Sequence, residues 1–135
     1  ITGSHNPKQD NGVKIAVKGS PRSGEDIAVL LSRIQMNLFL SGKGLISEAS
    51  ELIDEYQNRL INHITLDRPL KIVLDAGNGI GGPIASKAFK LTGADVIEVA
   101  CDVDGNFPLH HPDPAKSKNL VWLKQAVLEN NAHVG

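Results

Sequence analysis

The sequence predicts an α/β protein whose mixed, mainly parallel sheet is flanked by helices. The short apolar run Ile72–Leu74 is typical of a buried parallel strand, and Val96, Ile97 and Val99 are expected to form another strand. A helical pattern of apolar residues lies between them at residues 83–91, and another follows at residues 120–128. Strands and helices that alternate through short links favour right-handed crossovers within one sheet.

A half-buried strand is predicted near the N-terminus. Val13, Ile15 and Val17 alternate with polar or small residues, which is the period of two expected of a strand. The pair Asn11–Gly12 comes directly before this stretch and is a strong turn signal. A loop rich in glycine and proline is expected at residues 19–24.

Two helices are predicted next. The first begins near Ser23 in a pattern that resembles a capping box, and its apolar spacing runs through residues 27–38. Gly42 is expected to end it. The second is expected to begin at the cap Ser50 and to carry its apolar face as far as Ile64.

Composition limits the partners that we expect. The 135-residue chain has a net charge of -1 and no lysine or arginine block, which argues against nucleic acid. No apolar run approaches the roughly 20 residues that a membrane helix requires. Cys101 is the single cysteine, which excludes an intramolecular disulfide and favours a reducing, cytoplasmic location. A first residue other than Met and an apolar stretch at residues 132–135 that starts like a strand suggest a fragment of a longer protein.

The stretch Thr2–Pro7 could carry nucleophilic chemistry. Ser4 stands beside His5, and the proline after Asn6 restrains the backbone there. A serine hydroxyl needs a base or a metal before it becomes a useful nucleophile, and an ordinary turn is the other reading of the stretch. Lys14 could supply positive charge to a phosphoryl group, or could simply be solvated.

Gly77–Gly82 matches the pattern G-x-G-x-x-G between a predicted strand and a predicted helix. Asp95, Glu98 and Asp102 lie near the spacing at which a dinucleotide site places its ribose-binding acid. The charge of Asp75, directly before the loop, would oppose a pyrophosphate. A tight turn that uses glycine for close packing is the alternative, and the pattern alone leaves both readings open.

The segment Asp102–Pro114 is rich in potential metal ligands. His110, His111 and Asp113 could bind zinc, although adjacent histidines rarely point at one ion. A calcium loop of the EF-hand type is excluded, because Phe107 occupies the position that requires glycine. The prolines favour an ordered structural or recognition loop over a metal site.

Three stretches occur in this order: ITGSHNPKQDNGVKI, KIVLDAGNGIGG and VDGNFPLHHPDPAKSKNL. Together they resemble the α-D-phosphohexomutases, in particular the bacterial phosphomannomutase/phosphoglucomutase branch. The resemblance implies a fragment of a four-domain protein. Residues 1–44 would be the C-terminal part of domain I with the phosphoserine loop, and residues 45–135 most of domain II without its metal-binding loop. Phosphoglucosamine mutases usually carry alanine where Gly3 stands.

The resemblance also implies a reaction and its residues. Ser4 would be the phosphoserine that exchanges a phosphoryl group with hexose phosphates, and His5 and Lys14 would assist catalysis beside it. Ser4, His5, Asn6 and Lys14 would contact the substrate. Hexose 1,6-bisphosphate would be the intermediate and activator. Mg²⁺ would be held through the phosphate on Ser4, with its other ligands in a D-G-D-G-D-R loop beyond Gly135.

Mannose or glucose phosphates and the missing domains of the same chain are the partners that the resemblance implies. The fragment alone is therefore predicted to be an inactive piece of an isomerase. The alternatives are a nucleotide-binding α/β module that uses residues 77–82, a phosphoglucosamine mutase, and a non-catalytic domain that kept the fold.

Overall fold

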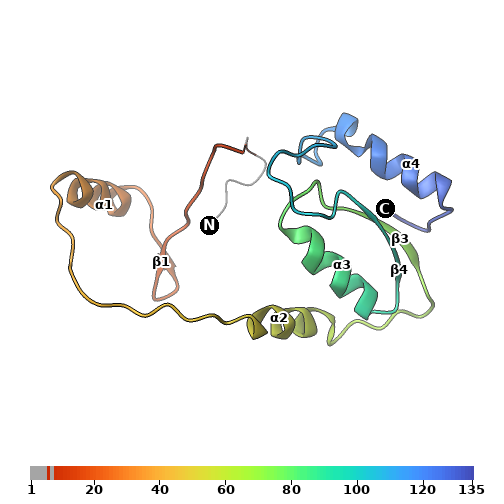
Figure 1. Cartoon of the computed structure of the whole chain (residues 1–135), viewed down its shortest axis with the longest axis horizontal. Helices are drawn as coiled ribbons and strands as arrows, with labels where there is room; N and C mark the ends of the chain where they lie inside the picture. Colours follow the sequence, from red (N-terminus) through yellow and green to blue (C-terminus); the bar gives the residue numbers. More distant parts are fainter. Residues whose placement is uncertain (1–5, 7) are drawn as a thin grey trace. The chain divides into compact units, whose positions relative to one another are not determined.

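The computed structural model describes residue 6 and residues 8–135, which form two compact units (Figure 1). The first unit comprises Ile1–Glu48 and the second Ala49–Gly135. The assignment of residues 1–44 and 45–135 to two family domains stays a prediction. In the part of the chain that is described, none of the helices combines the length and apolar character needed to cross a membrane.

The first unit contains a small antiparallel hairpin of β1 (Ala16–Val17) and β2 (Ser20–Pro21). The turn residues Lys18 and Gly19 have φ angles of 51° and 77°. Positive φ at both central positions is the two-residue turn whose twist suits a hairpin.

The strand predicted to start at Val13 is much shorter than expected. Only Ala16 and Val17 are extended in a ladder, and residues 11–15 have no regular structure. The partner strand explains this difference, because β2 has two residues and only the N–H of Arg22, which donates to Ile15 O at 2.8 Å, extends the pairing. Without a neighbouring strand, the backbone N–H and C=O groups of an extended segment lack hydrogen-bond partners, so the ladder does not continue beyond β2.

Helix α1 (Glu25–Gln35) begins and ends at residues other than those predicted. Its N-cap is Gly24, and no side chain caps it, so the capping box expected at Ser23 is wrong. The helix stops well before Gly42 because Asn37 adopts a left-handed φ of 55°. The N–H groups of Asn37 and Leu38 then donate to Ile34 O and Arg33 O, the reversed bonds of a Schellman motif.

The second unit is built on a parallel sheet, as predicted. β3 (Lys71–Asp75) pairs with β4 (Asp95–Val99) from Lys71 opposite Asp95 to Asp75 opposite Val99. On the other edge of β3, Val134 forms a parallel bridge with Ile72, and its carbonyl accepts from Val73 N at 2.9 Å. β3 is therefore central, with β4 on one side and the chain's last residues on the other.

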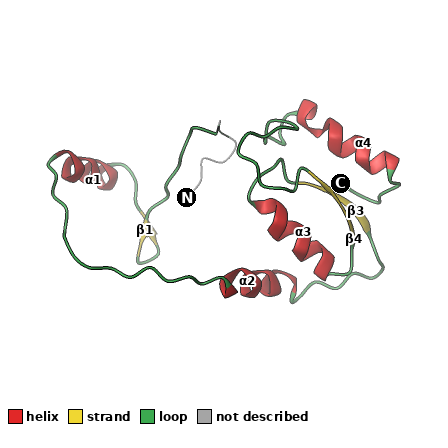
Figure 2. Ribbon diagram, viewed as in Figure 1, coloured by secondary structure: helices red, strands yellow, loops and turns green. Residues whose placement is uncertain are grey.

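The two crossover helices, α3 (Gly81–Leu91) and α4 (Val121–Glu129), lie on opposite sides of these strands (Figure 2). The chain steps from β3 to β4 through α3, and back past β3 through the 3₁₀ turn Ser117–Leu120 and α4. Right-handed crossovers that run in opposite directions place their helices on opposite faces. The buried apolar residues of the described chain lie in this unit: Ile72, Val73 and Cys101.

Helix α2 (Glu51–Ile61) packs against α3. Ser50 is its N-cap residue, as predicted, but its side chain makes no capping bond, and the helix ends before the expected Ile64. The side chain of Gln57 is 2% exposed and donates through Nε2 to Ile84 O at 3.1 Å. A buried amide that is hydrogen-bonded to backbone fixes the position of α2 along α3.

Gly82 of α3 lies directly against the backbone of Cys101, two residues after the end of β4. A Cβ atom built on Gly82 would lie 2.1 Å from Cys101 O and 2.9 Å from Cys101 Cα. Only a residue without a side chain allows the helix to approach the backbone so closely.

Replacing Gly82 with alanine should destabilise the second unit by about 1–3 kcal/mol, because the backbone at Cys101 must move aside. Gly81→Ala is the matched control, since nothing lies within 4 Å of a Cβ there, and it should be neutral or stabilising by under about 1 kcal/mol. Urea unfolding followed by the fluorescence of Trp122 measures both. Equal unfolding free energies for the two variants would contradict the packing described here.

Candidate functional site

The residues predicted to carry the chemistry are only partly described. Ser4 and His5 lie outside the described residues, so the geometry of the predicted phosphoserine loop stays a prediction. Asn6 and Lys14 are described, and both are exposed. Lys14 belongs to the irregular segment before β1, where its side chain is open to solvent and to a charged ligand.

A second candidate site lies at the carboxyl edge of the parallel sheet. β3 ends at Asp75 and β4 ends at Val99, and the loops that follow lead to helices on opposite faces. Open α/β sheets bind their ligands in the crevice where such loops diverge. We call this region, formed by residues 75–80 and 100–114, the carboxyl-edge cluster.

A buried pair, Asp75 and His110, joins the two loops of the carboxyl-edge cluster. His110 Nε2 lies 2.8 Å from Asp75 Oδ2 and 3.0 Å from Oδ1, and the side chains are 11% and 5% exposed. The N–H of Gly77 donates to Asp75 Oδ1 at 2.9 Å. The sequence did not predict this pair, because the residues are 35 positions apart; the signal available was that both follow the ends of neighbouring parallel strands.

The geometry does not support a zinc site in the segment of residues 102–114. His110 is held by Asp75, His111 is exposed, and the carboxylate of Asp113 lies 3.2 Å from Lys116 Nζ. Within the described residues, no group of three or more His, Cys, Asp or Glu side chains could hold a metal ion.

The glycine loop is a packed turn in which the amide groups of Gly77, Asn78, Gly79 and Gly82 are already used. Gly77 N–H donates to the carboxylate of Asp75, where a bound anion would otherwise sit. Other amides of the loop donate to backbone carbonyls: Asn78 to Ala100 at 2.7 Å, Gly79 to Ala76 at 2.9 Å, and Gly82 to Gly79 at 3.0 Å. A dinucleotide site needs such donors free for the pyrophosphate. The geometry therefore favours the turn reading over the nucleotide reading.

Asn78 adds a second connection between the loops. Its residue is 8% exposed with a φ of 56°, its Nδ2 donates to Asp102 O at 3.0 Å, and its carbonyl accepts from Asp104 N at 3.0 Å. Its Oδ1 is buried without a hydrogen-bond partner among the described residues. A buried acceptor of this kind is open to a donor from water or from another part of the protein.

Glu98, one of the acids considered for ribose binding, is engaged elsewhere. Its carboxylate accepts hydrogen bonds from Lys90 and Ser86 of α3. The bond from Lys90, followed by that from Ser86, lowers the pKa of Glu98 below its ordinary value. Glu98 therefore ties β4 to α3 and is not free to bind a sugar.

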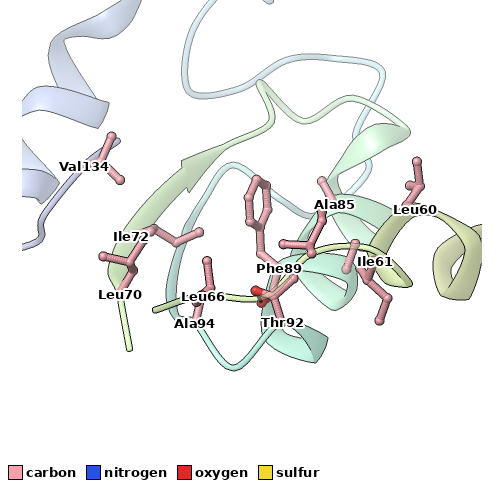
Figure 3. A pocket seen from close by; sticks show the side chains of 12 residues that line it. Leu60, Ile61, Leu66, Leu70, Ile72, Ala85, Phe89, Thr92, Ala94 and Val134 are labelled. Atoms are coloured by element: carbon pink, nitrogen blue, oxygen red, sulfur yellow. Dashed lines mark hydrogen bonds between the residues drawn. The ribbon is translucent and has the colours of Figure 1, made fainter. Parts of the chain in front are cut away.

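The second unit also contains an apolar cavity of about 390 Å³ (Figure 3). It lies between the end of α2, α3 and β3, and Val134 closes one side. Its lining offers one hydroxyl, that of Thr92, and no charge, so it does not suit a sugar phosphate. The lining residues are Leu60, Ile61, Ile64, Leu66, Leu70, Ile72, Ala85, Ala88, Phe89, Thr92, Ala94 and Val134.

Comparisons with known proteins agree on one family. The family model described as phosphoglucomutase/phosphomannomutase, alpha/beta/alpha domain II, matches residues 53–135. A phosphoglucomutase of Neisseria meningitidis serogroup A is 45% identical over 137 residues, covering 100% of this chain and 30% of that protein. A phosphomannomutase/phosphoglucomutase of Pseudomonas aeruginosa is 42% identical over 135 residues, covering 100% of this chain and 29% of that protein.

A solved structure and a more distant relative complete the comparison. The crystal structure of a phosphoglucomutase/phosphomannomutase family protein from Burkholderia thailandensis superposes with a TM-score of 0.88 at 42% identity, over 97% of this chain and 28% of that one. A phosphoglucosamine mutase of Salinispora arenicola is 30% identical over 145 residues. This chain thus spans about 30% of the length of its curated relatives. The predicted resemblance and fold class are confirmed.

The thiol of Cys101 should be unreactive in the folded protein. Burial, with a smaller contribution from the charge of Glu98, raises its pKa, and the residue is 7% exposed. At pH 8 less of it is thiolate than in an ordinary cysteine, so its reaction with a disulfide reagent should be about 10-fold or more slower. Because the chain has one cysteine, absorbance reports it alone. The rate in urea is the control, and equal rates with and without urea would contradict this description.

Proposed function

This chain belongs to the phosphoglucomutase/phosphomannomutase family, and we propose that it is the part of a phosphohexomutase that carries the phosphoserine loop and most of the second domain. The observation that carries the proposal is the domain II match over residues 53–135, together with relatives at 41–45% identity that align along the whole chain. The whole protein would interconvert hexose 6-phosphates and hexose 1-phosphates. That activity is an intramolecular phosphotransfer, an isomerase reaction.

In this proposal Ser4 carries the phosphoryl group. Its P–O bond breaks as the phosphorus is attacked by the free hydroxyl of the sugar phosphate, which gives hexose 1,6-bisphosphate and a free serine hydroxyl. Transfer of the other phosphate back to Ser4 then leaves the isomeric monophosphate. Phosphoryl transfer depends on positioning and on cations that stabilise the spreading negative charge.

The neighbouring residues take the supporting roles. Lys14, whose side chain is exposed, supplies positive charge to the phosphoryl oxygens. His5 accepts or returns the proton of the reacting hydroxyl, and Asn6 contacts the substrate beside it. Mg²⁺ bound to the phosphate would neutralise further charge, with its remaining ligands beyond Gly135.

Phosphomannomutase/phosphoglucomutase activity is favoured over the alternatives. The amides of Gly77, Asn78, Gly79 and Gly82 donate within the chain, which argues against a nucleotide at the glycine loop. The phosphoglucosamine mutase in the comparison is 30% identical, whereas the phosphoglucomutase is 45% identical.

Ser4→Ala in the full-length protein should reduce hexose phosphate interconversion roughly 10³-fold or more, because the phosphoryl carrier is lost. Lys14→Met should cost about 10²–10³-fold in kcat, the usual loss for one charge-stabilising group. Lys18→Met, at an exposed lysine of the adjacent hairpin, is the control and should retain activity. A coupled assay and mass spectrometry of phosphate on the peptide containing Ser4 measure these effects. An undiminished rate in Ser4→Ala would refute the proposal.

The 135-residue chain alone should show no mutase turnover, because the proposed magnesium ligands and sugar-binding parts lie outside it. The measurement is the same coupled assay with glucose 1-phosphate as substrate and glucose 1,6-bisphosphate as activator. The full-length protein at equal concentration is the control. Turnover by the 135-residue chain would show that it contains a complete site.

A further inference from the structure

The sequence contains the pair Asn–Gly twice, at residues 11–12 and at residues 78–79. In this pair the backbone nitrogen of glycine reaches the side-chain carbonyl carbon of asparagine with little hindrance, because glycine has no Cβ and its backbone is permissive. The attack releases ammonia and converts the asparagine to an acid. The fold determines whether a given pair reacts, since the two groups must first be free to approach each other.

The pair at residues 78–79 is held by the fold. Asn78 is 8% exposed, and its Nδ2 donates to Asp102 O at 3.0 Å. The N–H of Gly79, which carries the nitrogen that would attack, donates to Ala76 O at 2.9 Å. Both hydrogen bonds must break before the attack, and the loss of two such bonds slows a reaction about 10-fold or more. Asn78 is therefore protected.

The pair at residues 11–12 is open. Asn11 is exposed, and residues 11–15 have no regular structure. Among the residues that the structure describes, neither the side-chain amide of Asn11 nor the N–H of Gly12 has a hydrogen-bond partner. Such a segment changes conformation at almost no free-energy cost. The nitrogen of Gly12 therefore reaches Asn11 Cγ without breaking a hydrogen bond of the fold.

We propose that Asn11 is a site of spontaneous deamidation. The Gly12 nitrogen loses its proton to hydroxide and attacks Asn11 Cγ; the N–Cγ bond forms, the Cγ–Nδ2 bond breaks, and Nδ2 takes up a proton from water and leaves as ammonia. Water then opens the cyclic imide at either of its carbonyl carbons. Opening at Cγ gives aspartate in a normal backbone. Opening at the main-chain carbonyl gives isoaspartate, in which the backbone continues through Cβ and Cγ.

The position of Asn11 gives this modification a consequence for the reaction, and this consequence rests on the proposed function. Asn11 lies between Ser4 and Lys14 in the sequence. Isoaspartate adds one backbone atom to the segment that joins them, and it adds one negative charge to a chain whose net charge is -1. Because a misplacement of about 1 Å can cost about 10²-fold in rate, the isoaspartate form should be about 10-fold or more less active than the unmodified protein.

The test follows both asparagines during storage of the full-length protein in mildly alkaline buffer. The tryptic peptides of residues 9–14 and 72–87 report the two sites separately, through the mass change of ammonia lost and water gained. Asn11 should convert about 10-fold or more faster than Asn78, because the hydrogen bonds at Asn78 must open first. The rate should rise with pH, since the attacking nitrogen must lose its proton. In urea the two rates should become similar.

Two variants separate the modification from its effect on activity. Asn11→Gln keeps an amide at this position, but its ring closes more slowly because it is larger, so the variant should keep its initial activity on storage. Freshly purified Asn11→Asp carries the new charge without the added backbone atom. It should retain most of its activity in the coupled assay, which would assign the loss in stored wild-type protein to isoaspartate.

The outcomes are decided by two independent measurements. Equal rates at Asn11 and Asn78 in the folded protein, or no conversion at Asn11, would overturn the modification site. Equal losses of activity on storage in the wild type and in Asn11→Gln would overturn the effect on the reaction. Absence of turnover in the fresh wild-type protein would refute the proposed function and with it that effect, whereas the peptide masses would still decide whether Asn11 is modified.

Discussion

β3 is paired on both of its edges, and the arrangement of the second unit depends on that pairing. It runs parallel to β4 along its length and bridges Val134 on the other side. Parallel strands require crossover connections, and crossovers that leave in opposite directions put their helices on opposite faces. The loops after β3 and β4 therefore diverge at the carboxyl edge. The crevice there is a consequence of topology, before any side chain is considered.

The contacts that fill this crevice favour a packed turn over the dinucleotide site that the glycine pattern alone left open. The carboxylate of Asp75 accepts the amide of Gly77, and an anion is thereby already present inside the turn. A buried carboxylate is costly unless it is paired and hydrogen-bonded. His110 supplies the pairing from the neighbouring loop. Asp75, whose charge would oppose a pyrophosphate, is thus the partner of His110, which the sequence had offered as a zinc ligand.

The parts of the fold that depend on local pattern could be predicted from the sequence. Strands β3 and β4, helix α3 and the bridge at Val134 are found in the stretches where the sequence pattern predicted strands and a helix, although β4 contains no buried residue. The predicted bounds of α1 were wrong, because the start and end of a helix depend on particular hydrogen bonds at its capping residues. Asn37 ends α1 by adopting the left-handed conformation. Glycine adopts this conformation more often, and for that reason the sequence predicted that Gly42 would end the helix. Asp75 and His110 meet only through the topology, and no spacing along the chain encodes that contact.

Rigidity and proposed chemistry are divided between the two units. Every buried residue of the described chain lies in residues 49–135, whereas Ser4, His5 and Lys14 belong to the first unit. Core packing such as that at Gly82 therefore stabilises a unit that does not itself contain Ser4, the proposed phosphoryl carrier. Loss of an exposed side chain such as that of Lys14 should cost little stability, because the described residues of the first unit include no buried residue. Loss of a side chain such as Asp75, His110 or Asn78 should affect both stability and local geometry, because these groups are part-buried and hydrogen-bonded to the neighbouring loop. An activity assay alone cannot distinguish the loss of a reacting group from the loss of local packing. Each residue of the carboxyl-edge cluster therefore also needs a measurement of local structure.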